Sequence, residues 1–459
     1  MRNKSTGYEM CTVILIFIVG LIMSFAVPTW ETPDEYTHLW MIGESIGVED
    51  FSEKIADNIE LDQKRIEFHP EEKVHMDDQI ESMEMHPSYT RREMMPRSVS
   101  LSVIKHLPAT IGILLGILLG VPAYWVLQLG EVFSLLFYAC ICYLALKMIP
   151  VKKEMMAFLM LFPMTIQQVS SINYDAVLLP MCCLFIAYIL YLKFEKEEIG
   201  IRQITFVAVM WLIFTYIKMP YGLLGLIFFI IPVDKIKVDL HFVVIDEKFI
   251  KKWRIPVIIV GCAAFLVLIY LLKDNLYIQV VYGFVREWRR GLYLFKATGS
   301  YWAEYLMNST VGTFGWLDTP MAFNVVVMMF IVVLVASLLK NRDDMDYKLR
   351  IGDRVVLLGT FIILCLFITM SLANHTIKVT LFGSEQSSAT YEIREALYQI
   401  PYIGGLQGRY YLPFVPLLFI SLPTCIKNNR IVTGVAFALI ETGLYIYVCS
   451  LIISRFWCA

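Results

Sequence analysis

The amino-acid sequence predicts an all-α, polytopic integral membrane protein. Of its 459 residues, 58% are hydrophobic and only 17% are charged, whereas about a quarter of a typical soluble domain is charged. The mean hydropathy of +0.63 agrees. Three apolar runs are each long enough to cross about 30 Å of hydrocarbon as a helix, namely 11–27, 321–339 and 431–451.

Charge and cysteine content exclude several other classes. The net charge is −2, and with a pI near 6.4 the chain lacks the basic surface that a nucleic-acid partner requires. The ten cysteines lie in apolar stretches or at their ends, without a CxxC spacing, so neither a disulfide framework nor a zinc site is expected. The lipid bilayer is therefore the first expected partner.

The apolar runs predict a single transmembrane domain, 1–459, with 11 to 13 spans. The stretch 107–128 leaves two alternatives open. It forms a re-entrant hairpin or two tilted short helices, or else it crosses once and 155–172 is re-entrant. The other expected spans are 11–27, 131–149, 155–172, 175–192, 203–217, 221–232, 255–273, 321–339, 353–372, 409–425 and 431–452.

The distribution of basic residues predicts the orientation, because cytoplasmic loops carry an excess of Lys and Arg. Arg2 and Lys4 keep the N-terminus in the cytoplasm, and the span tally leaves the C-terminus outside. The long loop 28–106 is then extracytoplasmic and carries surface helices, and 274–319 and 373–408 are further outer loops. A multi-pass protein of the plasma membrane is expected.

The first polar motif, Pro28 to His38, directly follows the first span. Asp34 and Glu35 stand where a helix N-terminus favours anions. Asp34 and His38 are four residues apart and share a helical face. A carboxylate and an imidazole placed in this way can bind a metal or act as a base and its partner. The alternative interpretation is simple helix capping.

Two further polar groups interrupt apolar segments. Asp175 stands at the start of a span, where a charge is costly unless it has a function or is solvated; the alternative is a short capped turn. Lys218, followed by the helix-breaking Pro220, offers a cation for a phosphate. Its alternative is a side chain that reaches to the membrane interface.

The last two motifs lie near the beginnings of later spans. Trp316 fits an interfacial aromatic belt and Asp318 a helix cap. In Gln407-Gly408-Arg409-Tyr410, the glycine allows close backbone approach and the arginine offers two parallel donors for a phosphate; an aromatic belt with one interfacial arginine is the alternative. By the charge rule all five motifs face outward, which predicts one outward-facing cleft with carboxylates at one pole and cations at the other.

The ordered motifs PDExxH, NYDA, KxPY, FGWLDTP and QGRYYLPxxP resemble a group of bacterial membrane proteins classed as a domain of unknown function, from Pro28 to Pro416. That group is similar to the GT-C glycosyltransferases, which use polyprenyl-phosphate-linked sugars outside the membrane. The resemblance implies a catalytic or metal-binding role for Asp34, with Glu35 as its neighbour, and phosphate binding by Lys218 and Arg409. Thr32 and Thr37 depart from the usual motif.

The preferred hypothesis is an inverting glycosyltransferase that moves a sugar from a polyprenyl-phosphate-linked donor to a saccharide or cell-envelope polymer. Asp34 acts as the base or binds a divalent metal, Mg or Mn, and His38 orients or polarises. Lys218 and Arg409 hold the donor phosphate. Additional substrate-binding candidates are Asp175, Asp318, Gln407, Trp316 and Tyr410.

Two other hypotheses remain open. A non-enzymatic transporter, flippase or assembly scaffold for lipid-linked saccharides needs the phosphate site without the base, together with a polar path across the membrane. The nearly charge-free spans favour a one-sided site instead. The third hypothesis is a structural protein of the cell envelope.

Overall fold

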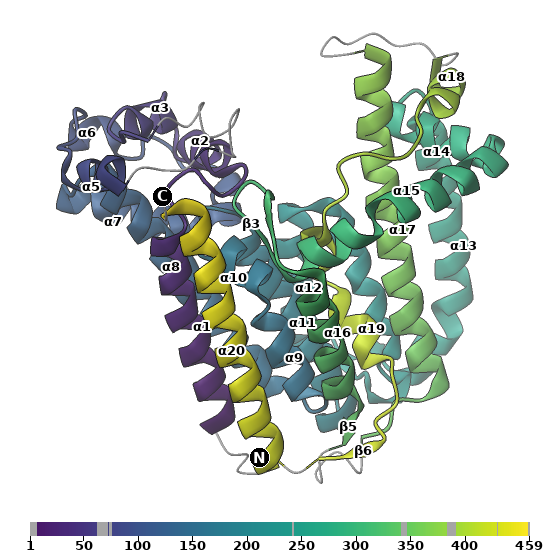
Figure 1. Ribbon diagram of the computed structural model, residues 1–459. Helices are drawn as coiled ribbons and strands as arrows, with labels where there is room; N and C mark the ends of the chain where they lie inside the picture. Colours follow the sequence, from purple (N-terminus) through teal and green to yellow (C-terminus); the bar gives the residue numbers. More distant parts are fainter. Residues whose placement is uncertain are drawn as a thin grey trace.

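Long apolar helices form the body of the protein in the computed structural model (Figure 1). The structure describes residues 7–61, 72, 76–240, 243–340, 347–382, 392–428 and 430–457. Within these residues, seven helical segments are long and apolar enough to cross a membrane. They are α1 (Gly7–Ala26), η1 with α7 (Leu101–His106 and Leu107–Leu119), α8 (Ala123–Met148), α11 (Asp175–Glu195), α13 (Glu247–Leu271), α17 (Ile351–Phe382) and α20 (Arg430–Phe456).

Three shorter apolar helices accompany the long ones: α12 (Ile201–Ile217), the 3-10 helix η2 (Met219–Ile230) and α16 (Phe323–Leu338). Together these elements confirm the all-α polytopic fold. Helix α11 lies at the centre, because 89% of its apolar window is buried. Its residues are hydrophobic on every face, which is the pattern of a helix enclosed by other helices.

Two predicted spans are broken where proline occurs. The run 155–172 is divided into α9 (Lys153–Met160) and α10 (Pro163–Val169). The run 409–425 contains only the 3-10 turn η5 (Gly408–Tyr411) and the short helix α19 (Val415–Ile420). Proline lacks the backbone N–H and clashes with the preceding turn, so a continuous helix cannot pass through it.

The ambiguous stretch 107–128 belongs to two antiparallel helices. Helix α7 ends at Gly120, whose φ of 71° suits the left-handed end of a helix. The chain then turns through Pro122 into α8, which begins eight residues before the predicted start at 131. The stretch 107–128 is therefore shared between two helices, of which Leu101–Leu119 and Ala123–Met148 are each long enough to cross a membrane, and the choice between the two alternatives stays a prediction.

Two lobes stand at one end of the helical body (Figure 1). The first lobe contains α2 (Glu35–Ile46), α3 (Phe51–Ala56), α5 (Met76–Glu84) and α6 (Arg91–Met94), so the described part of 28–106 carries the surface helices expected there. The second contains α14 (Leu276–Arg286), α15 (Trp288–Val311) and α18 (Glu392–Gln399). Helices α14 and α18 pack against α17. Much of both predicted outer loops 274–319 and 373–408 is thus helical.

Very little sheet is present among the described residues. Two-residue strands form three pairs: β1 (Val238–Asp239) with β2 (Val244–Ile245), β3 (Thr313–Phe314) with β4 (Thr319–Pro320), and β5 (Leu339–Lys340) with β6 (Ile426–Lys427). A short 3-10 turn, η3 (Val233–Lys235), precedes β1.

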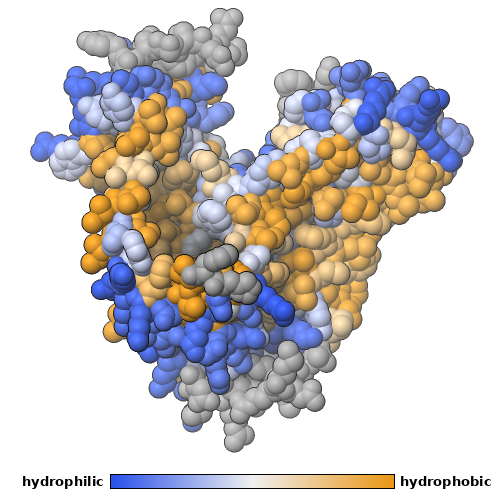
Figure 2. Space-filling view, turned by 180° about the vertical axis from the view of Figure 1, so that it is seen from behind, coloured by the Kyte–Doolittle hydropathy of each residue, from blue (hydrophilic) through white to orange (hydrophobic). Residues whose placement is uncertain are grey.

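The surface fits a protein embedded in lipid. Figure 2 shows apolar side chains over the flanks of the body and hydrophilic ones at its two ends. Helix α1 begins at the end without lobes and α20 finishes at the lobed end (Figure 1). The two ends of the helical bundle thus differ, as the predicted orientation requires, while the side of the membrane that each faces stays a prediction.

Candidate functional site

The first and last polar motifs meet in one ion pair. Nη2 of Arg409 donates to Oδ2 of Asp34 at 3.1 Å. The Arg409 side chain is only 6% exposed, whereas that of Asp34 is 56% exposed. The arginine is therefore a buried cation, and the carboxylate that pairs with it is accessible to solvent.

A second contact fixes the guanidinium from the other side. Nη1 of Arg409 donates to Oε1 of Gln168 at 2.9 Å. The same oxygen accepts from Nδ2 of Asn173 at 3.0 Å, which orients the Gln168 amide. Among the described residues, Nε of Arg409 and Nε2 of Gln168 are buried donors without a partner. Buried donors normally find an acceptor, so these two suit a ligand oxygen or a water.

Gly408 lets the arginine segment approach α15. A Cβ at this position would collide with the backbone nitrogen of Thr310 and the carbonyl oxygen of Leu306. The Gly408 N–H donates to Oγ of Ser309 at 2.7 Å. The glycine is therefore required for close packing, as its place in the motif predicts.

Lys218 lies among aromatic rings next to this pair. Its Nζ is 4.4 Å from the centre of the Tyr410 ring and 5.4 Å from that of Tyr174. It also donates to the Tyr174 hydroxyl at 3.1 Å. Proline at position 220 ends α12 just before this point, so the ammonium is held at a helix end and is not buried within a span.

Asp175 belongs to the same cluster. It is the first residue of α11 and is 9% exposed. Its N–H donates to Oδ1 of Asn173 at 3.0 Å, so the short capped turn predicted as the alternative is present. Its carboxylate also lies within electrostatic range of Lys218, Arg409 and Asp34.

His38 forms a pair that the sequence did not predict. Its Nδ1 lies 2.9 Å from Nε2 of His106, so one ring donates to the other. The His38 and Tyr174 rings are nearly perpendicular, in an edge-to-face contact with 4.8 Å between ring centres. Burial lowers the pKa of His38 to about 3, with Arg409 and Lys218 adding to the effect. His38 is therefore neutral at physiological pH.

The turn that carries Asp34 is strained. Trp30 and Asp34 both have a left-handed backbone, with φ of 70° and 69°, which costs energy in residues other than glycine. The indole N–H of Trp316 donates to the Trp30 carbonyl at 2.8 Å and holds the turn in place. Asp34 makes no capping hydrogen bond with its side chain, which leaves the carboxylate to Arg409.

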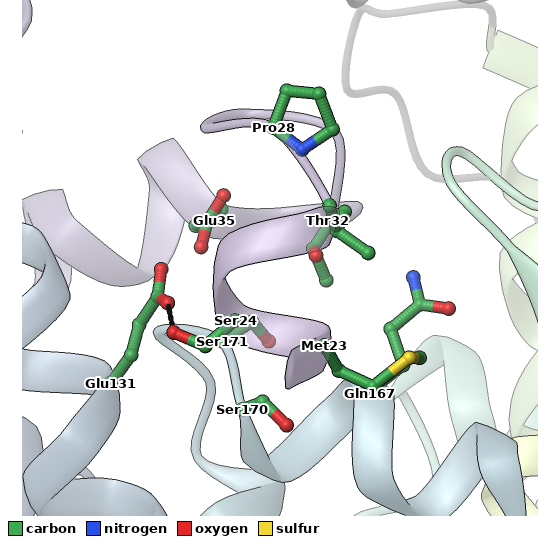
Figure 3. Close-up of a pocket in the computed structure, with 10 residues that line it drawn as sticks. Met23, Ser24, Pro28, Thr32, Glu35, Glu131, Gln167, Ser170 and Ser171 are labelled. Carbon is green, nitrogen blue, oxygen red and sulfur yellow. Dashed lines mark hydrogen bonds between the residues drawn. The ribbon is translucent and has the colours of Figure 1, made fainter. Parts of the chain in front are cut away.

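Two predicted site residues, Glu35 and Asp318, lie differently from expectation, while the role of Gln407 stays a prediction. Glu35 is buried and lines a separate pocket beneath the turn (Figure 3). Asp318 accepts from Nε of Arg455 at 2.9 Å and does not cap a helix, because α16 begins only at Phe323. Gln407 precedes η5, and within the described residues its buried amide oxygen has no partner.

Three buried polar residues of this region were not predicted from the sequence: Gln168, His106 and Glu131. Gln168 is fully buried in α10 and Glu131 is 5% exposed in α8. Each is a polar residue inside an apolar run, which is a signal of a functional site in a membrane protein. Their partners lie far away in the chain, so the signal alone could not place them.

The described residues do not supply a complete set of ligands for a metal ion. In the part of the chain that the structure describes, no three His, Cys, Asp or Glu side chains are grouped as for a metal ion. Asp34 is paired with Arg409, and Nδ1 of His38 is paired with His106. A divalent metal at Asp34 and His38 stays a prediction, and we derive no step from it.

A hollow separates the two lobes on the face shown in Figure 2, and apolar side chains cover much of its walls. Hydrogen bonds join the elements of the polar cluster, which are the turn before α2 of the first lobe, the segment 168–175, the α12–η2 junction and η5. The fold and the cluster together define a polytopic α-helical membrane protein with a buried arginine, a half-buried lysine and an accessible carboxylate.

The family follows from comparison with known sequences. Residues 17–418 match the family described as "Predicted membrane protein (DUF2142)". The chain belongs to this family, as its motifs indicate. No curated protein and no solved structure gives a significant match.

Proposed function

We propose that the protein is an inverting glycosyltransferase that takes a sugar from a polyprenyl-phosphate-linked donor at the outer face of the membrane. The acceptor is a saccharide or another polymer of the cell envelope. The observation that carries the proposal is the contact between Asp34 and Arg409, which places an accessible carboxylate beside a buried cation.

The cations suit the phosphate of the donor. Arg409 keeps a buried Nε donor without a partner among the described residues, and Lys218 is held over Tyr410. When the sugar leaves, negative charge grows on the polyprenyl phosphate. Fixed cations in a site shielded from water stabilise such charge strongly. The apolar surface around the body offers a place for the lipid chain.

Asp34 suits the base. Its exposed carboxylate accepts the proton of the acceptor hydroxyl, while the hydroxyl oxygen bonds to the anomeric carbon. The bond from that carbon to the phosphate oxygen breaks, and its electron pair leaves with the phosphate. His38 is neutral and close to this cluster, so it contributes hydrogen bonding to the substrate or orientation of the turn.

The decisive experiment compares Asp34→Asn with Glu44→Gln, a substitution of an exposed residue on the helix that follows Asp34. Purified protein in proteoliposomes receives a radiolabelled polyprenyl-phosphate sugar and envelope saccharides. Loss of a general base lowers a rate by about 10²- to 10⁴-fold, so Asp34→Asn should lose nearly all transfer while Glu44→Gln retains it. Equal transfer by both correctly inserted variants would exclude Asp34 as the base.

The transporter or flippase alternative has a different outcome in the same vesicles. It predicts that a fluorescent lipid-linked saccharide changes leaflet while no sugar is transferred. It also predicts that Arg409→Ala slows this movement and Asp34→Asn affects it only through Arg409. Movement without transfer would replace our proposal with this one.

A further inference from the structure

A basic pocket lies at the end of the helical bundle opposite the lobes, where β5 and β6 pair (Figure 1). Its volume is about 250 Å³. Four cationic side chains line it, and no Asp or Glu is found among the described residues of its lining. The four are Lys152, Lys340, Lys348 and Arg354. They share no member with the polar cluster around Arg409, so the basic pocket is a separate site.

Segments that are far apart in the sequence build the basic pocket. Lys340 ends β5, which follows α16, and its carbonyl oxygen accepts from the Asn428 N–H at 3.1 Å. This pairing places the end of α16 beside the chain that follows α19. Lys348 precedes α17, and Arg354 lies in the first turn of that helix. Lys152 directly precedes α9.

The charge of Lys152 is part of the wall of the pocket. The residue is only 3% exposed. Its Nζ donates to the carbonyl oxygens of Phe419 at 2.8 Å and Leu422 at 2.6 Å, at the end of α19. The backbone of Lys152 is left-handed, with φ of 57°, which a residue other than glycine adopts only where its surroundings fix it. The fold therefore holds this ammonium in place.

Arg354 supplies a second cation with an unused donor. In the part of the chain that the structure describes, its Nε is buried and has no hydrogen-bond partner. Buried donors normally find an acceptor. The positive end of the α17 dipole adds to the same charge, because the N-terminus of a helix favours anions. An acceptor with negative charge would satisfy both the guanidinium and the helix end.

The carboxylates close to this pocket have partners of their own. Asp353 accepts from Nζ of Lys193 at 2.8 Å, and Oε1 of Glu195 accepts from the Tyr347 hydroxyl at 2.5 Å. Residues 341–346 lie outside the described residues and contain three further acids, so a variant without these charges is included in the experiment. The three acids are Asp343, Asp344 and Asp346.

We infer that the basic pocket binds a phosphate group, carried by an anionic lipid headgroup or by a small soluble phosphate compound. A phosphate brings negative charge and several acceptor oxygens to the cations. The remaining lining is partly apolar, with Val151, Leu349 and Leu422, which suits the carbon atoms next to a phosphate ester. Pockets for larger ligands begin at about 300 Å³, so a headgroup fits better than a nucleotide.

The first experiment measures lipid binding by native mass spectrometry of delipidated protein in a neutral detergent. Wild type should retain phosphatidylglycerol in preference to phosphatidylcholine. Arg354→Gln removes a charged donor and should weaken this binding by roughly 10- to 100-fold. Lys348→Gln, at an exposed residue that does not endanger folding, should weaken it by about 2- to 5-fold.

Lys147→Gln is the matched control. Lys147 is an exposed lysine in the last turn of α8 and does not line the pocket. An excess of basic residues is common at the cytoplasmic ends of spans, and a general attraction of this kind would be reduced equally by all three substitutions. Equal losses in Lys147→Gln, Lys348→Gln and Arg354→Gln would therefore overturn the inference. An unchanged affinity in Lys147→Gln supports it.

The second experiment identifies the source of the phosphate. Inorganic phosphate or glycerol 3-phosphate is added to delipidated protein at constant ionic strength, and the melting temperature is measured. A ligand that binds the folded protein raises this temperature. A rise that Arg354→Gln abolishes assigns the pocket to a soluble phosphate, whereas lipid binding without such a rise assigns it to a headgroup. Either result supports a phosphate site.

A third arm tests whether the acids of 341–346 occupy the pocket themselves. In this variant Asp343, Asp344 and Asp346 are all replaced by Asn. Binding that occurs in wild type supports the inference. If wild type binds neither the lipid nor the soluble phosphates, the inference is wrong, and binding by the triple variant alone would identify the chain's own carboxylates as the occupants. None of these measurements depends on sugar transfer, so the result is independent of the proposed function.

Discussion

Nη2 of Arg409 lies 3.1 Å from Oδ2 of Asp34, although the two residues are 375 positions apart in the sequence. This ion pair joins the first polar motif of the chain to the last. The arginine is buried and the aspartate is exposed. Removing the aspartate would leave a buried charge with one partner fewer, which is costly in a low-dielectric site.

Replacing Arg409 with lysine keeps the positive charge but removes the guanidinium, which donates to both Asp34 and Gln168. The substitution tests whether these two hydrogen bonds contribute to phosphate binding in addition to the charge. A lysine has one nitrogen on a flexible stem and cannot hold Asp34 and Gln168 in the fixed geometry of the guanidinium. Losing one charged hydrogen bond costs about 1.5–3 kcal/mol. We expect binding of polyprenyl phosphate in nanodiscs to weaken by roughly 10- to 100-fold. Arg455→Lys, at the arginine that pairs with Asp318, serves as the control, and equal affinities for both variants would contradict the prediction.

Replacing Tyr410 tests the aromatic support of Lys218. Tyr410→Phe keeps the ring under the ammonium, whereas Tyr410→Leu removes it. A cation over an aromatic ring gains about 0.5–2 kcal/mol. Tyr410→Leu should therefore weaken phosphate binding by about 2- to 30-fold, and Tyr410→Phe should bind like wild type. Equal loss in both variants would assign the effect to the hydroxyl group.

Replacing Gly408 with alanine tests the close approach of the arginine segment to α15. The added methyl group would collide with backbone atoms of Thr310 and Leu306. Overpacking of this kind costs about 1–3 kcal/mol, so the melting temperature should fall. Gly404→Ala is the matched control, because its nearest neighbouring atom would be 3.7 Å away. An unchanged melting temperature for Gly408→Ala would show that the segment can move aside.

The acid side of the stability profile tests the buried His38. Its pKa is lowered to about 3, so between about pH 6.5 and 3 the unfolded chain binds a proton that the folded protein does not. Stability should therefore be complete above pH 6.5 and fall as the pH drops toward 3. His38→Gln should reduce this decline in chemical unfolding, while His86→Gln, at an exposed histidine, should not. A wild-type slope in His38→Gln would place the titrating group elsewhere.

Hydropathy predicted the long helices well, because a continuous apolar run has few alternatives to a helix in lipid. The runs 11–27 and 431–452 correspond closely to α1 and α20. Errors occurred at proline. Pro163 divides a predicted span into α9 and α10, and the run 409–425 contains only η5 and the six-residue α19. Mean hydropathy does not register the missing N–H of proline.

The sequence also identified most members of the polar cluster, because a charge or an amide within an apolar chain is conspicuous. Asp34, Lys218, Asp175 and Arg409 were all found in this way. Their partners were not. Gln168 and His106 became recognisable only when the helices that carry them were packed against α2 and η5.

The amino-acid sequence alone determined a helical membrane protein with polar motifs between apolar runs, because hydrophobicity and the need to pair backbone groups act locally. Only the tertiary structure decided which of those motifs meet. It joined Asp34 to Arg409, paired Asp318 with Arg455, and turned Glu35 toward Glu131. These choices depend on helix packing and on which buried polar atoms find partners, and no local pattern encodes that.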